Sequence, residues 1–73
     1  MMQEFIRQEI PVTTPPLVHY MHVCDGQVVG FYSKEDIETM CSSLHTCLKM
    51  GLPDEILPEA NELLEAIEKA LKA

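Results

Sequence analysis

Residues 17–32 show the clearest pattern of hydrophobic positions in the chain. Two runs rich in β-branched and aromatic residues, LVHYMHV and VVGFY, lie on either side of Asp25 and Gly26. An Asp-Gly pair favours a tight two-residue turn, because both central positions of that turn need a positive φ. The pattern therefore predicts an antiparallel β-hairpin. A regular register from this turn would place Val23 opposite Val28 and Tyr20 opposite Phe31.

Neither face of the predicted hairpin is polar. In the regular register one face would carry His19, Met21, Val23, Val28, Gly30 and Tyr32. The other face would carry Val18, Tyr20, His22, Cys24, Gln27, Val29 and Phe31. A sheet with one face in water normally alternates between apolar and polar residues. We therefore expect both faces to be covered, and two short helices are too few to cover both without a partner.

Two amphipathic helices are predicted in the second half of the chain. Residues 33–50 have apolar residues three and four apart, namely Ile37, Met40, Cys41, Leu44 and Leu48. Ser33 is the predicted N-cap, and Gly51 is the predicted left-handed residue that ends this helix. The second helix is predicted within residues 54–72, with the main part from Pro58 onward. Its apolar stripe is Ala60, Leu63, Leu64, Ile67, Ala70 and Leu71.

The first 16 residues form an N-terminal arm and a proline-rich connector. The apolar residues of the arm fit a helical stripe, but Ile6, Gln8, Ile10 and Val12 also alternate as a strand would. We favour the strand, because a lone hairpin is only marginally stable and a third strand would steady it. Residues 11–16 (PVTTPP) are predicted to be a stiff, extended connector that keeps the arm at a set distance from the hairpin.

These elements predict one small α+β domain over residues 1–73. Its antiparallel hairpin, with the arm as a possible third strand, packs against two antiparallel helices. A chain of 73 residues buries only about 60% of its unfolded surface and is marginally stable alone. We therefore expect a homodimer, since small chains often gain stability by association.

The charge balance narrows the choice of partners. There are 12 acidic and 5 basic residues, which gives a net charge of −7. Direct binding to nucleic acid or to an anionic membrane surface requires clustered Lys and Arg and is not expected. We also expect no membrane span, because no run of about 18 apolar residues occurs. The three cysteines are a poor disulfide framework, so a cytoplasmic protein with reduced thiols is the simplest interpretation.

Acidic residues follow one side of the second predicted helix. They are Glu55, Glu59, Glu62, Glu65 and Glu68. Glu65 with Lys69 and Glu68 with Lys72 have the spacing of stabilising helical ion pairs. An ordinary solvated helix face explains this pattern most simply. The alternative is that the ridge contacts a basic surface of a partner protein.

Histidine and cysteine occur together twice, which offers a second hypothesis. His22 and Cys24 share a face of the hairpin, and Cys41 and His45 lie four apart on a helix. These four side chains would suit zinc if the two elements brought them together. Buried thiols that act as small hydrophobic groups are far commoner. Catalysis by a cysteine is not expected, because no orienting acid or oxyanion loop accompanies these residues.

The sequence thus favours a non-enzymatic protein-interaction module without a cofactor. Such a module would act as an adaptor, a regulatory subunit or an inhibitor of a larger protein, including the kind of inhibitor with which phages and plasmids occupy a basic surface. The predicted contact residues are Tyr20, Phe31, Tyr32, Glu55, Glu59 and Glu62. The alternative is a small structural zinc-binding domain that uses His22, Cys24, Cys41 and His45.

Overall fold

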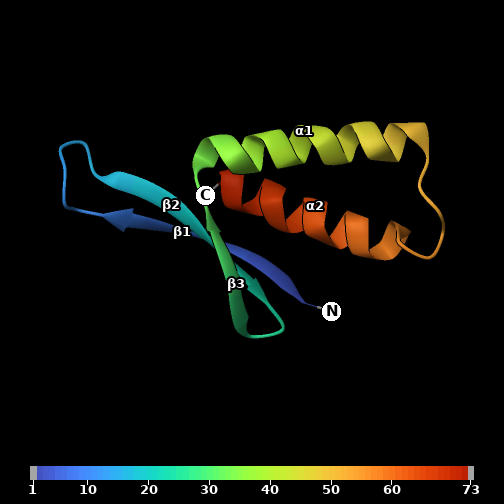
Figure 1. Ribbon diagram of the computed structural model, residues 1–73, viewed down its shortest axis with the longest axis horizontal. Helices are drawn as coiled ribbons and strands as arrows, with labels where there is room; N and C mark the ends of the chain where they lie inside the picture. The colour runs from blue at the N-terminus through green and yellow to red at the C-terminus, as the bar shows by residue number, and fades with distance from the viewer. Residues whose placement is uncertain (1, 73) are drawn as a thin grey trace.

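The computed structural model describes residues 2–72 and shows an α+β fold. Its elements are β1 (Gln3–Ile10), β2 (Leu17–Cys24), β3 (Gln27–Tyr32), α1 (Lys34–Met50) and α2 (Leu57–Lys72). The strands form one antiparallel sheet in the order β1-β2-β3. Figure 1 shows the two antiparallel helices together on one side of this sheet. The predicted fold class is therefore confirmed.

The N-terminal arm is a strand, which decides between the two alternatives left open by its sequence. β1 pairs with β2 along its whole length, from Gln3 opposite Cys24 to Ile10 opposite Leu17. Residues 11–16 form the loop between these paired strands, and the N–H of Val12 donates to the carbonyl of Ile10 at 2.9 Å. The prediction that this segment is extended is therefore wrong, because it bends back on itself to join two antiparallel strands.

The register of β2 and β3 departs from the prediction after the second pair. Cys24 lies opposite Gln27 and Val23 opposite Val28, as expected, but His22 lies opposite Gly30. Val29 is thus the extra residue of a β-bulge. A bulge turns every later side chain of its strand to the other face.

Two aromatic residues change faces as a result. Tyr32 pairs with Tyr20 on the inner face, and Phe31 pairs with Met21 on the outer face, so the predicted pairing of Tyr20 with Phe31 is wrong. Gly30 suits this arrangement, because a Cβ atom there would lie 3.4 Å from the ring of Tyr32. The aromatic ring uses the space that the glycine leaves open.

The hydrophobic core lies between the inner face of the sheet and the two helices. It consists of Phe5, Tyr20, Ile37, Ile67 and Ala70, with Ile37 and Ile67 fully buried. α2 packs mainly on β1, and α1 packs on α2 and touches β2. The apolar stripes predicted for both helices therefore face the core that they were expected to form.

The ends of α1 follow the sequence signals. The Ser33 hydroxyl accepts a hydrogen bond from the Asp36 N–H at 3.1 Å, and the Ser33 N–H donates to the Asp36 carboxylate at 3.4 Å. This is a capping box, which satisfies two free N–H groups. Gly51 ends the helix with φ +94°. α2 begins at Leu57, after a turn over residues 54–56.

Neither helix in the described part of the chain is long and apolar enough to cross a membrane.

Candidate functional site

The outer face of the sheet is largely apolar, and within residues 2–72 no helix packs on it. Strand pairing places ten side chains on it: Glu4, Ile6, Gln8, Ile10, Leu17, His19, Met21, Val23, Val28 and Phe31. Phe31 is 59% exposed, Leu17 54% and Val28 52%. Exposed apolar side chains are common singly, but a contiguous group usually marks an interaction site. This set of residues is called the outer face below.

Polar groups on the outer face are already paired with one another. The Nε2–H of His19 donates to the Gln8 amide oxygen at 2.6 Å. The His19 ring also lies against Phe31, with ring centroids 5.2 Å apart. Glu4 is the one charged residue in the outer face. Apart from the Glu4 carboxylate, which would have to stay hydrated, few polar groups of this surface would be left without a partner if it lost its water.

The three aromatic residues predicted as partner contacts lie in different environments. Tyr20 is 2% exposed and belongs to the core, so it cannot touch a partner on the surface. Tyr32 is half-buried on the inner face, where its ring lies 6.2 Å from those of Phe5 and His22. Phe31 is exposed on the outer face. The bulge at Val29 causes this separation, and the adjacent Gly30 was the available signal, because a glycine inside a strand pattern often accompanies a bulge.

The acidic ridge is present on the second helix and the turn before it. Glu55 and Glu59 are exposed, whereas Glu62 is half-buried. Within residues 2–72, none of these three carboxylates belongs to an ion pair. The expected pairs of Glu65 with Lys69 and of Glu68 with Lys72 are also not formed there. Glu68 instead faces His45 on the neighbouring helix.

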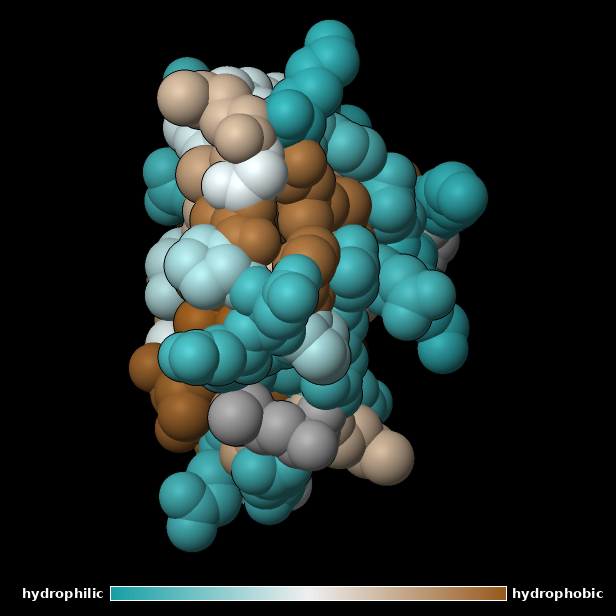
Figure 2. Space-filling view, turned by 90° about the vertical axis from the view of Figure 1, so that its right-hand side faces the viewer, coloured by the Kyte–Doolittle hydropathy of each residue, from teal (hydrophilic) through white to brown (hydrophobic). Residues whose placement is uncertain are grey.

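A second apolar surface lies where the linker joins the two helices. It is a shallow hollow of about 310 Å³ whose apolar lining is Leu44, Cys47, Leu52, Ile56, Ala60 and Leu63. Figure 2 looks at this end of the molecule and shows hydrophobic atoms gathered in its upper half. The hollow is open to solvent and contains few polar groups that could orient a ligand, so it does not resemble a small-molecule site.

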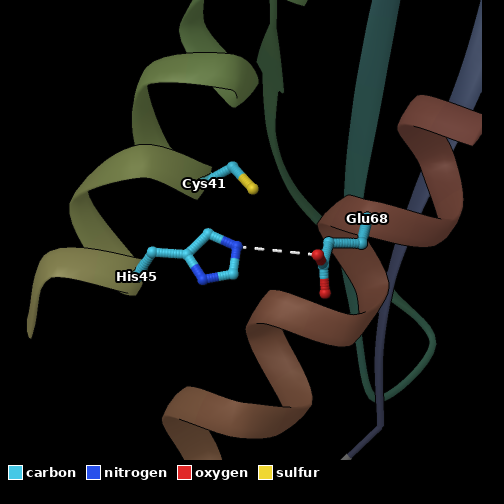
Figure 3. Close-up of side chains that lie close together, drawn as sticks. All are labelled: Cys41, His45 and Glu68. Atoms are coloured by element: carbon cyan, nitrogen blue, oxygen red, sulfur yellow. Dashed lines mark ion pairs between the residues drawn. The ribbon is translucent and has the colours of Figure 1, made fainter. Parts of the chain in front are cut away.

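Three potential metal ligands meet between α1 and α2. The Cys41 sulfur, a ring nitrogen of His45 and a carboxylate oxygen of Glu68 all lie within 4.8 Å of one another. The His45 Nε2 and Glu68 Oε2 atoms are 3.6 Å apart. Figure 3 shows Cys41 and His45 on successive turns of α1, both directed toward Glu68 on α2. These residues are called the Cys–His–Glu cluster below.

The structure brings together only two of the four residues predicted as zinc ligands. Cys41 and His45 meet, because residues four apart share one face of a helix. His22 instead stacks on Phe5, with ring centroids 4.3 Å apart, and its Nε2–H donates to Gln3 at 2.6 Å. In residues 2–72, neither His22 nor Cys24 belongs to a group of three metal-binding side chains. A site of these four residues is therefore not formed.

Glu68 was not among the metal ligands predicted from the sequence. Its side chain borders the apolar stripe of α2, one position after buried Ile67. A residue at that position points toward the neighbouring helix at the edge of the core. This was the signal in the sequence from which a contact of Glu68 with α1 could have been predicted. The residue opposite Glu68 depends on how the two helices are aligned, which local spacing does not reveal.

Two groups in and near these sites have shifted pKa values. Partial burial lowers the pKa of His22, because the charged ring would lose hydration. Burial and the nearby Glu68 carboxylate raise the pKa of the Cys41 thiol. Cys41 therefore stays protonated at neutral pH, whereas a reactive cysteine needs a lowered pKa. This environment disfavours a nucleophilic role for Cys41.

Comparison with known proteins assigns neither a family nor a function to this chain. No protein-family model, curated protein or solved structure matches the chain. The outer face and the Cys–His–Glu cluster are therefore the features of this chain that indicate a function.

Proposed function

We propose that this chain is a non-enzymatic protein-interaction module whose docking surface is the outer face, and that a second copy of the chain occupies it. The observation that carries the proposal is the contrast between the two sides of the sheet. The inner face is covered by α1 and α2, whereas Leu17, Val28 and Phe31 on the outer face are more than half exposed. A second sheet packed on this face would complete a core on both sides.

The distribution of charge supports a second copy as the occupant. Two molecules with a net charge of −7 repel one another in most orientations. The outer face carries a single acidic residue, Glu4, and most other acidic residues lie on the helices behind the sheet. Contact between two outer faces places both helical layers on the outside. Their charges are then separated by more than the Debye length of about 8 Å, so salt screens the repulsion.

The size of the outer face predicts a weak dimer. β1 and β2 have 8 residues each. At about 3.3 Å per residue and about 4.8 Å between strands, the three-stranded face measures roughly 26 by 14 Å. Two such faces would bury on the order of 800 Å², which is less than the roughly 1,200 Å² of most stable complexes. We therefore expect self-association in the micromolar range or weaker.

A dimer of this kind would leave the acidic ridge free for a larger protein. Glu55 and Glu59 are exposed on the helical layer, away from the outer face, and both carboxylates would face solvent in the dimer. A partner with a basic surface would be attracted by this charge. The module would then act as an adaptor, a regulatory subunit or an inhibitor, in the cytoplasm where its free thiols remain reduced.

The first test replaces Phe31 by Asp and measures self-association by sedimentation equilibrium. We expect the wild-type chain to show a concentration-dependent dimer. Phe31→Asp should weaken it by at least about tenfold, because a buried unpaired carboxylate would face the partner sheet. Met50→Asp makes the same charge change at a residue that is 82% exposed at the end of α1, far from the sheet. This control should dimerise as the wild type does.

Two results would contradict the proposal. A wild-type chain that stays monomeric up to millimolar concentration would show that a second copy does not occupy the outer face. A dimer that tolerates Phe31→Asp but is weakened by Met50→Asp would place the interface at the end of the helices. Circular dichroism of each variant shows whether the fold is retained.

A further inference from the structure

The Cys–His–Glu cluster is separate from the proposed dimer interface. Cys41 and His45 come from α1 and Glu68 comes from α2, so all three lie in the helical layer. They lie where α1 packs against α2, beside apolar side chains of both helices such as Leu44 and Leu63. An activity at this cluster would therefore leave the outer face free.

The three groups are close to the spacing that a metal ion requires. Zinc binds sulfur at about 2.3 Å and nitrogen or oxygen at about 2.0–2.2 Å, which at tetrahedral angles separates neighbouring ligands by about 3.3–3.6 Å. The His45 and Glu68 atoms are already 3.6 Å apart. The cluster as a whole spans no more than 4.8 Å, so a contraction of about 1 Å would complete the set.

The side chains have the freedom to make this contraction. The His45 side chain is 55% exposed and the Glu68 side chain is 42% exposed. Small rotations of these two groups need no change in the core. Cys41 is half-buried beside the apolar stripe, so its sulfur is the fixed point of the cluster.

The donor atoms identify the class of metal. Calcium and magnesium select oxygen ligands, whereas a set of one thiolate, one imidazole and one carboxylate suits zinc and other borderline transition metals. Three protein ligands leave a fourth tetrahedral position, which faces solvent here because His45 and Glu68 are half exposed. Water is the simplest fourth ligand in this position.

We propose that Cys41, His45 and Glu68 bind one zinc ion, which ties α1 to α2. The Cys41 thiol gives its proton to water as the sulfur–zinc bond forms, and the Glu68 carboxylate exchanges its contact with His45 for a contact with the metal. The ion binds the folded chain more tightly than the unfolded chain, because unfolding separates Glu68 from Cys41 and His45. Binding therefore stabilises the fold by mass action.

Cobalt titration is the direct test, because a thiolate bound to Co²⁺ gives a charge-transfer absorption that carboxylate sites do not give. The protein is first treated with chelator and reductant, exchanged into chelator-free buffer, and titrated with Co²⁺ in the presence of excess Mg²⁺. We expect one Co²⁺ per chain and displacement by an equal amount of Zn²⁺. At free zinc about 100 times the dissociation constant, the unfolding midpoint should rise by on the order of 10 °C.

Matched variants separate the cluster from adventitious binding. Cys41→Ser and Glu68→Gln should each lower zinc affinity by more than about tenfold, and Cys41→Ser should abolish the charge-transfer band. Cys47→Ser and Glu65→Gln make the same changes at exposed residues on the same two helices. These controls should keep the wild-type affinity within about twofold.

The proposal is overturned if the wild-type chain fails to bind zinc below millimolar concentration. It is also overturned if Cys41→Ser keeps the charge-transfer band, or if the controls lose affinity as much as the cluster variants do. Because Glu68 is nearly half exposed, Glu68→Gln should fold normally and keeps the test valid even if Cys41→Ser is unstable.

Discussion

At the scale of single residues, His22 occupies an unusual position for a titratable group. Its ring stacks on Phe5 at 4.3 Å and lies 6.2 Å from Tyr32, on the inner face of the sheet. Its Nε2–H is held by Gln3 at 2.6 Å. The His22 ring thus packs as an aromatic side chain between Phe5 and Tyr32, and this packing favours the neutral imidazole. Partial burial lowers its pKa for the same reason.

His22 should therefore make stability depend on pH. The unfolded histidine has a pKa of about 6.5, and the folded one has a lower pKa, so the unfolded chain binds more protons in this window. The contribution of neutral His22 is complete above about pH 6.5 and is lost as the pH falls through the folded pKa. We expect the wild type to lose stability relative to His22→Phe between about pH 7 and about pH 5, measured by urea unfolding. Parallel curves for the two proteins would contradict this role.

The turn residues allowed the first strand pairs of the hairpin to be predicted, but not the later ones. Asp25 and Gly26 specified the turn and the first two pairs after it, because an Asp-Gly turn has a defined backbone geometry. The bulge at Val29 had only the neighbouring Gly30 as a signal, and a glycine in a strand is compatible with a bulge without requiring one. The extra residue Val29 moved Phe31 to the outer face and Tyr32 to the inner face.

At the scale of elements, α1 was predicted almost to the residue because both of its ends carry local signals. Ser33 and Asp36 form the capping box, and Gly51 has the positive φ that ends the helix. The alignment of α1 with α2 has no comparable signal, because it results from packing. The pair Cys41 and His45 was therefore predicted from spacing alone, whereas their neighbour Glu68 was not.

The capping box should contribute measurably to stability. Ser33→Ala removes the hydroxyl that accepts from the Asp36 N–H and should lower the free energy of unfolding by about 0.5–2 kcal/mol. Ser43→Ala is the matched control, because Ser43 is exposed in the middle of α1. That change should cost less than about 0.5 kcal/mol. Equal losses in chemical denaturation would show that the cap contributes nothing specific.

At the scale of the whole molecule, the net charge of −7 and the apolar outer face act against each other. Charge repels a second copy, and apolar surface attracts it. Raising the salt concentration screens the repulsion but leaves the hydrophobic contact in place. Contact with a basic protein through the acidic ridge would respond in the opposite way, since screening weakens attraction between opposite charges.

Self-association should therefore become tighter as salt increases. We expect the dimer dissociation constant to fall severalfold between about 0.05 M and about 0.5 M sodium chloride, measured by sedimentation equilibrium. Phe31→Asp should stay largely monomeric over the same range. A dissociation constant that rises with salt would indicate that ion pairs hold the two copies together, which the outer face does not provide.

The bulge in β3 also bears on how far strand pairing between molecules can extend. A three-stranded sheet has two edges, and unprotected edges are where proteins polymerise into fibrils. Here the β3 edge is 6 residues long and interrupted at Val29, whereas the β1 edge is 8 residues long and regular. A molecule with only one sheet edge that can pair can form a dimer through that edge, but it cannot add further molecules to build a continuous sheet. The bulge at Val29 thus makes the β3 edge a poorer template than the β1 edge for pairing with a strand of another chain.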